Sequence, residues 1–510
     1  MVLYTAYDSI LKGKTGLTHR QKVMNKYLNI VDVPAVDGCD IVSTLNVNMQ
    51  DIAEKALIDQ LKEINASVGV AILMEVKTGE VKAIVNMTKG SDGVYREVKN
   101  NAVSDMMEPG STFKTASIMV ALEDGYITPD QLVDTKNGVY MMHGSPMKDH
   151  NWHRGGYGVI DITKVLMVSS NIGVSRVIDE NYHNQPEKYV EGLYKLGIAT
   201  PLNLDIPGAA KKPNIRKPTK NNWSRTALAW MSIGYETQVP PMNTLAFYNA
   251  IANNGVMVKP KFVKSIVKDG QVIEEIPTEV LNPAIASPKT IEQIQVILEK
   301  VVSEGLGKPA GSKQFHVSGK TGTAQVSKGS GGYKSGTMQY LVSFCGYFPS
   351  ENPKYSCIVA IQKSGLPASG GLMAGSVFSE IAERVFAKHL AQDLKGAKDS
   401  TAILTPDVKK GILADAQYIL DKIKANPVNL GEEKQQDPKR VPNVVGMGAK
   451  DAVYLLESAG LKVQLSGMGK VKSQSIPAGN TLHKGKTIQL RLVKQCNKLV
   501  FSPQKQFCLQ

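Results

Sequence analysis

The chain has 510 residues, of which 42% are hydrophobic and 21% are charged. This composition indicates a globular protein of about three domains, and it excludes a disordered chain, a collagen and a coiled-coil rod. The net charge is +14, and residues 441–510 alone contribute +8, from ten basic and two acidic residues. A basic surface attracts nucleic acid, anionic lipid or an anionic wall polymer, but it also serves solubility, so charge alone selects no partner.

Cysteine usage and hydropathy leave the cellular compartment open. Five cysteines without a Cys-x-x-Cys pair do not make a disulfide framework. No stretch approaches 18 consecutive apolar residues, so no membrane-spanning helix is expected. The first 14 residues also lack the basic-then-apolar order of a signal peptide.

The first ninety residues change from irregular to regular patterns. Residues 1–45 are mixed and polar and are expected to form a short irregular lead. Apolar residues at helical spacing predict a helix over 49–64. Two β-rich runs over 68–76 and 80–87, joined by Lys77-Thr78-Gly79, predict a hairpin.

The middle of the chain reads as helices separated by a loop. A helix is expected over 111–124, ended by Gly125. Two more helices are expected over 162–168 and 172–179, and residues 141–156 are expected to be a loop. These helices precede every strand expected after residue 256.

Strand patterns return in the second half. Asp269-Gly270 within 257–277 predicts a hairpin, and the Gly-, Ser- and Lys-rich segment 327–338 is expected to be a mobile loop. Cys345 and Cys357 fall on neighbouring expected strands and are expected to be buried thiols. The other strands and a closing helix are expected over residues 315–326, 339–348, 355–363 and about 374–393. This order predicts an α+β fold rather than alternating βαβ units.

A second, smaller unit is expected near the C-terminus. A charged linker precedes it, with one helical stretch near 407–424. Within the unit, a helix is expected over 449–458 and strands over 461–465 and 487–492. The final residues show no usable pattern.

Ser111 and Lys114 are the first residues that could carry chemistry. They follow the tight turn Pro109-Gly110, and their three-residue spacing puts both side chains on one helix face. A serine hydroxyl becomes a good nucleophile only beside a base, and a lysine is such a base when burial or a nearby cation lowers its pKa. The same spacing also occurs at Ser9 and Lys12 and at Ser265 and Lys268, so an N-cap serine with a solvated lysine is the simpler interpretation of this motif alone.

Two further motifs add polar groups that a substrate could use. Ser169 and Asn171 lie between two expected helices, where a hydroxyl could relay a proton and an amide could hold a peptide, although helix capping explains them as well. A strand segment supplies a cation, hydroxyls and a glycine that allows close approach to the backbone, through Lys320, Thr321, Gly322 and Thr323. A P-loop is excluded there, because the position that requires glycine is Gln314.

The three motifs together are far more specific than any one of them. Ser-x-x-Lys, Ser-x-Asn and Lys-Thr-Gly occur in this order, 58 and 151 residues apart, as in penicillin-recognising serine acyltransferases. Over about residues 5–395 the chain resembles the class B penicillin-binding proteins, including the segments 232–235, 252–255 and 344–349. The resemblance implies the transpeptidase-like α+β fold, with an antiparallel sheet and a helical subdomain.

The resemblance also implies a domain organisation. Residues 441–493 resemble a PASTA domain, a small β-α-β module, and residues 7–13 resemble the end of the family's pedestal domain. The chain is therefore expected to be N-terminally truncated, without the family's membrane anchor. The expected parts are a pedestal remnant, a transpeptidase domain, a linker with a helix, a PASTA domain and a tail, over residues 1–45, 46–395, 396–440, 441–493 and 494–510.

The implied activity is that of a peptidoglycan D,D-transpeptidase. Such an enzyme cross-links stem peptides ending in D-Ala-D-Ala through a serine acyl-enzyme, and β-lactams inhibit it. The implied catalytic residues are Ser111, Lys114, Ser169, Asn171 and Lys320, and the implied substrate-binding residues are Thr321, Gly322 and Thr323. The resemblance further implies the periplasmic face of the cytoplasmic membrane, glycan-polymerising and divisome membrane proteins as partners, and no nucleic acid. The PASTA-like unit favours a role in septal cell-wall synthesis.

Two other functions stay open at this stage. A D,D-carboxypeptidase or β-lactamase would use water as the acceptor and needs a deacylating base, for which Glu187 and Glu191 are candidates. A non-catalytic penicillin-binding sensor or wall-binding scaffold is the second alternative. His143, His150 and His153 could suggest a metal, but no cysteine or ordered carboxylate pattern joins them, so no metal and no cofactor are expected.

Overall fold

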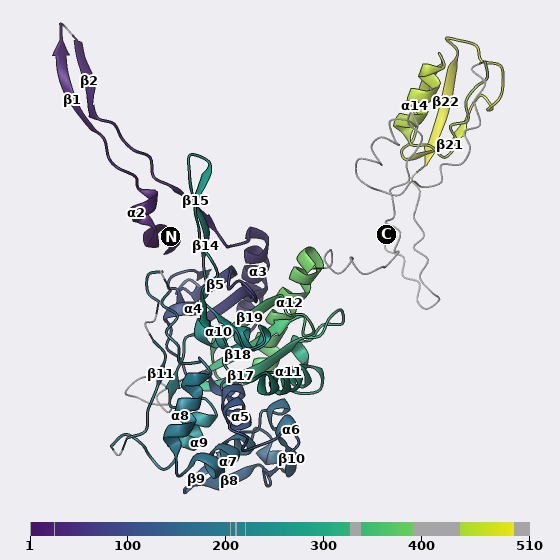
Figure 1. Cartoon of the computed structure of the whole chain (residues 1–510). Coiled ribbons are helices and arrows are strands. Elements are labelled where there is room, and N and C mark those ends of the chain that lie inside the picture. Colours follow the sequence, from purple (N-terminus) through teal and green to yellow (C-terminus); the bar gives the residue numbers. More distant parts are fainter. Residues whose placement is uncertain are drawn as a thin grey trace. The chain divides into compact units, whose positions relative to one another are not determined.

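The computed structural model describes residues 2–24, 26–204, 206–209, 212–219, 221–326, 338–390 and 439–493 (Figure 1). The chain divides into two units, Met1–Gly396 and Ala397–Gln510, and each is described by itself. The expected helix near 407–424 and nearly all of the expected loop over 327–338 lie outside the described residues. None of the helices that the structure describes is long and apolar enough to cross a lipid bilayer.

A six-stranded sheet with antiparallel neighbours forms the centre of the first unit. In spatial order its strands are β17 (Ser318–Val326), β18 (Gln339–Phe348), β19 (Tyr355–Ser364), β4 (Val68–Glu75), β5 (Val81–Lys89) and β6 (Tyr95–Arg96). The expected β4–β5 hairpin and the expected strands of the second half are confirmed. Because β17 stands at one end of this order, the Lys-Thr-Gly segment lies on an edge strand of the sheet.

Alternating side chains of the sheet enter two separate cores. On β4, Val70 and Ile72 join the core on one face, whereas Ala71 and Leu73 join the core on the other. This period of two is the intrinsic geometry of a strand. Helices α3 (Val47–Glu63) and α12 (Ser376–Val385) cover the second face, and α12 is flanked by π-helical turns η5 (Gly370–Gly375) and η6 (Phe386–Leu390).

The two strand cysteines lie in these separate cores. Cys345 belongs to the core on the first face and Cys357 to the core on the second, although they occupy adjacent strands. Both are buried and free, which confirms the expectation of buried thiols. Their opposite orientation prevents a disulfide between them.

A helical region covers the first face of the sheet, on the side away from α3 and α12 (Figure 1). The helices expected over 111–124, 162–168 and 172–179 are confirmed. Its helices and short turns are α4 (Asn101–Ser104), η1 (Gly110–Thr112), α5 (Lys114–Glu123), η2 (Trp152–Arg154), α6 (Ile162–Met167), α7 (Asn171–Tyr182), α8 (Pro186–Lys195), α9 (Ala227–Ser232), α10 (Pro241–Ala252), α11 (Pro288–Ser303) and η3 (Lys308–Ala310).

Short strands connect this helical region. The expectation of a loop over 141–156 is wrong in part, because β8 (Val139–Met142) and β9 (Ser145–Lys148) pair as a hairpin there. Its turn residues His143 and Gly144 both have positive φ, of 50° and 86°, and such a two-residue turn matches the twist of paired strands. The other short strands are β3 (Asp40–Ser43), β7 (Leu132–Asp134), β10 (Val159–Asp161), β11 (Asn214–Ile215), β12 (Thr237–Gln238), β13 (Met257–Val258), β14 (Val263–Lys268), β15 (Gln271–Glu275) and β16 (Val280–Asn282).

The N-terminal segment is more regular than its sequence indicates. The expectation of an irregular lead is wrong, because β1 (Leu17–Val23) and β2 (Lys26–Val33) pair antiparallel after the short helices α1 (Val2–Ala6) and α2 (Asp8–Leu11). Nearly every residue of the two strands is exposed. Without a buried face the hairpin has no clean hydrophobic alternation, so its sequence carries little strand signal.

The part of the second unit that the structure describes, residues 439–493, is a three-stranded sheet with one helix. Helix α14 (Ala449–Ser458) and strands β20 (Lys462–Ser466) and β22 (Thr487–Val493) occur where expected, and β21 (Lys470–Gln474) was not expected. Strands β20 and β22 are parallel, and β21 pairs antiparallel with β22. Alternate residues of β22 are buried against α14 in the unit's own apolar core.

The aromatic packing behind the sheet should dominate local stability. Phe378 on α12 is fully buried, with its ring 4.7 Å from that of Phe344 and 5.8 Å from that of Phe348. Phe378→Ala should cost about 3–5 kcal/mol of unfolding free energy, because it leaves a cavity. Leu372→Ala on η5, where the side chain is 68% exposed, should change it by less than about 0.5 kcal/mol. Equal losses in denaturant titrations of the two variants would contradict this packing.

Candidate active site

A tight turn places Ser111 at the start of α5. Gly110 has a φ of +57°, and a β-carbon there would lie 2.8 Å from the Ala324 side chain on β17. Only glycine therefore fits this left-handed, closely packed position. Ser111 follows it within η1 and is partly exposed, whereas Lys114, the first residue of α5, is completely buried.

The Lys114 amine reaches from α5 to the residues that precede α7. Its Nζ donates to the carbonyl oxygen of Ser169 at 2.6 Å, to Oδ1 of Asn171 at 2.7 Å and to the Ser169 hydroxyl at 3.3 Å. Burial lowers the pKa of Lys114 to about 7. The negative charge of the Asp149 carboxylate acts in the opposite direction and raises this pKa, but burial has the larger effect. An amine with this pKa is half neutral near neutral pH and can accept a proton.

The segment between α6 and α7 is held in a constrained shape. Ser169 has a φ of +55°, which is uncommon for a residue with a side chain and is typical of functional sites. The next residue, Ser170, caps α7, since its hydroxyl accepts from the Gly173 amide at 2.9 Å. This turn directs the Ser169 carbonyl and the Asn171 side chain to the same amine.

Asp149 is a site residue that the sequence analysis missed. It is almost fully buried, and it accepts from the Ser170 hydroxyl at 2.7 Å and from the amides of Asn171 and Ile172 at 2.6 and 3.1 Å. The Asn171 side chain also donates to the carbonyl of the preceding residue, Lys148, at 2.7 Å. Asp149 thereby fixes the start of α7, where a carboxylate is favoured by the helix dipole. No motif joins it to the Ser-x-Asn segment, which begins twenty residues later.

The Lys-Thr-Gly segment lies on β17, the edge strand, next to η1. Lys320 is fully buried, and its Nζ donates to the carbonyl of Thr321 at 3.1 Å. Burial lowers the pKa of Lys320 well below its usual range, and the nearby Lys114 lowers it further. The Thr323 hydroxyl accepts from the Gly370 amide at 3.2 Å.

Gly322 permits the close approach of β17 and η1. A β-carbon at this position would lie 2.2 Å from the Ser343 hydroxyl and 3.0 Å from the Thr112 methyl group. Any side chain would therefore separate the strand from the turn that carries Ser111. The strand's outer edge has no neighbour among the described strands, and such an edge offers backbone groups to an extended peptide.

The structure thus brings some of the predicted residues into direct contact and others only into proximity. Lys114, Ser169 and Asn171 share hydrogen bonds. The charge of Lys114 contributes to the lowered pKa of Lys320. Within the described part of the chain, no residue hydrogen-bonds the Ser111 hydroxyl, and catalytic hydrogen bonds often tighten only when substrate binds. The arrangement supplies a partly exposed hydroxyl, two buried amines and a strand edge, which are the parts of an acyl-transfer site.

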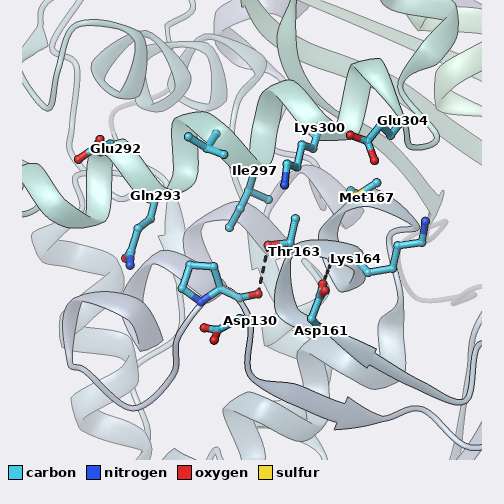
Figure 2. Close-up of a pocket in the computed structure, with 12 residues that line it drawn as sticks. Asp130, Asp161, Thr163, Lys164, Met167, Glu292, Gln293, Ile297, Lys300 and Glu304 are labelled. Carbon is cyan, nitrogen blue, oxygen red and sulfur yellow. Dashed lines mark hydrogen bonds between the residues drawn. The ribbon is translucent and has the colours of Figure 1, made fainter.

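A separate cavity of about 580 Å³ lies between α6 and α11 (Figure 2). Asp161, Lys164, Lys300 and Glu304 are among the side chains that line it. None of the eight predicted site residues lines this cavity. Its charges are mixed, and it does not overlap the Lys114 site.

Comparisons with known proteins agree with this arrangement. The family described as the penicillin binding protein transpeptidase domain matches residues 69–383, and the PASTA domain family matches residues 439–494. The chain is 26% identical over 397 residues to the peptidoglycan D,D-transpeptidase FtsI of Buchnera aphidicola, covering 74% of this chain and 64% of that protein. It is 27% identical over 509 residues to stage V sporulation protein D of Bacillus subtilis, covering 96% and 72%.

A solved structure shows the same architecture. Penicillin binding protein 3 of Mycobacterium tuberculosis superposes with a TM-score of 0.63 at 26% identity, over 76% of this chain and 85% of that one. The chain spans less than two thirds of the length of the first curated relatives it matches. Because the transpeptidase family accounts for more than half of the residues and a PASTA domain follows it, the chain belongs to the class B penicillin-binding proteins with a C-terminal PASTA domain.

Proposed function

We propose that the chain is a peptidoglycan D,D-transpeptidase that works through a Ser111 acyl-enzyme. The observation that carries the proposal is the buried Lys114 amine, whose pKa of about 7 makes it a base at neutral pH. It lies on the first turn of α5, directly after the turn that presents the partly exposed Ser111. A serine with a neutral amine nearby is an activated nucleophile.

In the proposed acylation step, Ser111 Oγ attacks the carbonyl of the penultimate D-Ala, and neutral Lys114 takes the hydroxyl proton. The backbone amides of Ser111 and Thr323 hold the developing oxyanion, as preorganised donors do in acyl transfer. Asn171 holds a peptide amide of the substrate. The stem peptide lies along the open edge of β17 as an added strand.

The second half of the proposed cycle releases and replaces the leaving group. The carbon–nitrogen bond to the terminal D-Ala breaks, and its amine takes a proton from Lys114 through Ser169. The hydrogen bond from the Lys114 amine to the Ser169 hydroxyl, at 3.3 Å, supports this relay. Lys320 and the hydroxyls of Thr321 and Thr323 hold the terminal carboxylate. An amine of a second stem peptide then attacks the ester carbonyl and gives its proton to neutral Lys114. The new amide bond forms, the bond from the carbonyl carbon to Ser111 Oγ breaks, and Lys114 returns a proton to Oγ.

The cellular setting of the proposal follows from the family. We infer the periplasmic face of the cytoplasmic membrane, a role in septal wall synthesis, and glycan-polymerising and divisome membrane proteins as partners. β-Lactams would acylate Ser111 as substrate mimics. We further propose residues 46–395 as the catalytic domain and 441–493 as the PASTA domain, with 1–45 as a pedestal remnant.

Hydrolysis of the acyl-enzyme is the second candidate activity, and the acidic residues disfavour it. Glu187 and Glu191 are exposed on α8. Among the described residues, the carboxylate that touches the Ser-x-Asn segment is Asp149, and its oxygens are already occupied by three donors. A deacylating base for water is therefore lacking among these groups. A sensor without activity would need no base with a lowered pKa.

The nucleophile assignment predicts which variant loses penicillin labelling. Intact mass after benzylpenicillin should show one adduct on the wild-type chain and none on Ser111→Ala, because only an activated hydroxyl opens the lactam. The matched control is Ser9→Ala, which removes the serine of another Ser-x-x-Lys pair and should label normally. Labelling of Ser111→Ala would refute the assignment. An adduct that disappears within seconds while drug is consumed would favour the hydrolase.

The lowered pKa of Lys114 predicts a pH profile. The acylation rate constant with benzylpenicillin should fall about tenfold per pH unit below pH 7 and level off above it, because the neutral amine is the base. Lys114→Met should lower the rate by about 10²- to 10⁴-fold. A rate that is independent of pH between 5.5 and 8 would exclude Lys114 as the base.

Asp149 is predicted to act as a positioning residue through Asn171 and Lys114. Asp149→Asn removes the charge that raises the pKa of Lys114, so the midpoint of the acylation pH profile should move to lower pH. Acylation should also slow by about tenfold or more, since charge-assisted hydrogen bonds to α7 are lost. The control is Asp161→Asn, which alters the equivalent cap of α6 and should leave the midpoint in place. An unshifted midpoint in Asp149→Asn would mean that the residue is only structural.

A further inference from the structure

Two histidines and an aspartate meet at the far end of α7 from the Ser-x-Asn segment. Nε2 of His143 lies 2.9 Å from each carboxylate oxygen of Asp179, and Nδ1 of His183 lies 3.3 Å from one of them. The two imidazole rings stack, with centroids 4.7 Å apart and planes 19° from parallel. One ligand atom from each residue lies within 4.8 Å of the other two.

These three residues come from two elements that are built rigidly. Asp179 and His183 are four residues apart on α7 and at its C-cap, so they share one helix face. His143 occupies the β8–β9 turn in a left-handed conformation, with φ +50°, which carries its ring out to α7. From the sequence, His143 would be grouped with His150 and His153. Instead, His150 pairs with the Tyr157 hydroxyl at 3.0 Å, and the ring of His153 lies edge-on to Trp152.

We propose that His143, Asp179 and His183 form a binding site for a divalent transition-metal ion of the zinc type. Two imidazole nitrogens and a carboxylate are a donor set that suits Zn²⁺ rather than Ca²⁺ or Mg²⁺, which prefer oxygen ligands. In a tetrahedral zinc site with bonds of 2.0–2.2 Å, ligand atoms lie about 3.3 Å apart. The two nitrogen–oxygen distances of 2.9 and 3.3 Å are close to that spacing.

The cluster is open to solvent. Among the described residues, no lysine or arginine forms an ion pair with the Asp179 carboxylate. The side chain of His183 is 50% exposed, so an ion can enter and water can complete the coordination. Arg176, the cation on the preceding turn of α7, is engaged by Glu180 at 2.6 Å and by the carbonyl of Asp134 at 2.7 Å. Within the described residues, the hydrogen-bonding partners of the Asp179 carboxylate are the two histidines.

Metal binding would join the tip of the β8–β9 hairpin to the end of α7. The other ends of the same two elements meet at the proposed active site, where Lys148 and Asp149 bind the start of α7. The ion would therefore add a second attachment between the hairpin and α7, at the end opposite to Asp149. This inference concerns binding alone and does not depend on the proposed activity.

Calorimetric titration of the metal-stripped full chain with ZnCl₂ tests the site. We expect one saturable equivalent that is missing in the double variant His143→Ala/His183→Ala. Asp179→Asn keeps a hydrogen-bonding side chain but should weaken binding by about tenfold or more, because it removes the anionic ligand. Co²⁺ should give visible d–d absorption in the wild-type chain and lose it in the double variant. Zn²⁺ should also raise the unfolding temperature of the wild-type chain more than that of the double variant.

The control is His153→Ala, which removes an exposed histidine outside the cluster and should bind one equivalent as the wild-type chain does. Circular dichroism of each variant checks that it is folded. Equal zinc stoichiometry and affinity in the wild-type chain and the folded double variant would place the ion elsewhere, for example on the cysteines. Absence of binding at about 100 μM Zn²⁺ would reduce the cluster to a hydrogen-bonded contact, and either result would overturn the proposal.

Discussion

The burial of the Lys114 amine is the constraint on which the rest of the site depends. An isolated ammonium inside a protein is costly, so the group must find partners or lose its proton. Lys114 does both, because three oxygen contacts surround it and its pKa is lowered to about 7. Lys320 lies buried nearby with its own pKa lowered, and two adjacent cations in a low dielectric oppose each other. Burial is therefore what favours a neutral Lys114 amine at the pH where acyl transfer needs one.

The backbone around Lys114 takes shapes that would be unfavourable elsewhere. Ser169 adopts a left-handed conformation, and Gly110 and Gly322 allow β17 and η1 to approach more closely than any side chain permits. The two glycines lose more conformational freedom on folding than other residues do, and the left-handed backbone of Ser169 is strained in the folded state. In return, these backbone conformations bring polar groups of one element close to the side chains of another. The well-packed aromatic core behind the sheet supplies the stability that such a site requires.

The sequence predicted the periodic parts of this structure better than the contacts that complete it. The helix over Val47–Glu63 and the strands of the central sheet have buried faces, so the spacing of their apolar residues can be recognised in the sequence. The β1–β2 hairpin has no buried face, and the β8–β9 turn depends on a left-handed histidine, so neither leaves a clear pattern. The three motifs could be found because their spacing is distinctive. Asp149 could not, since its role arises only when β9 folds back onto α7.

Helix α7 gives the far-end histidine cluster a physical connection to the proposed active site. Its first residues hold Lys114, and its last residues meet the hairpin turn that contains His143. The hairpin runs alongside and returns to Asp149, so α7 is held at both ends by one element. The Lys114 site and the histidine cluster therefore depend on the same pair of elements, and the packing of the hairpin against α7 positions both of them.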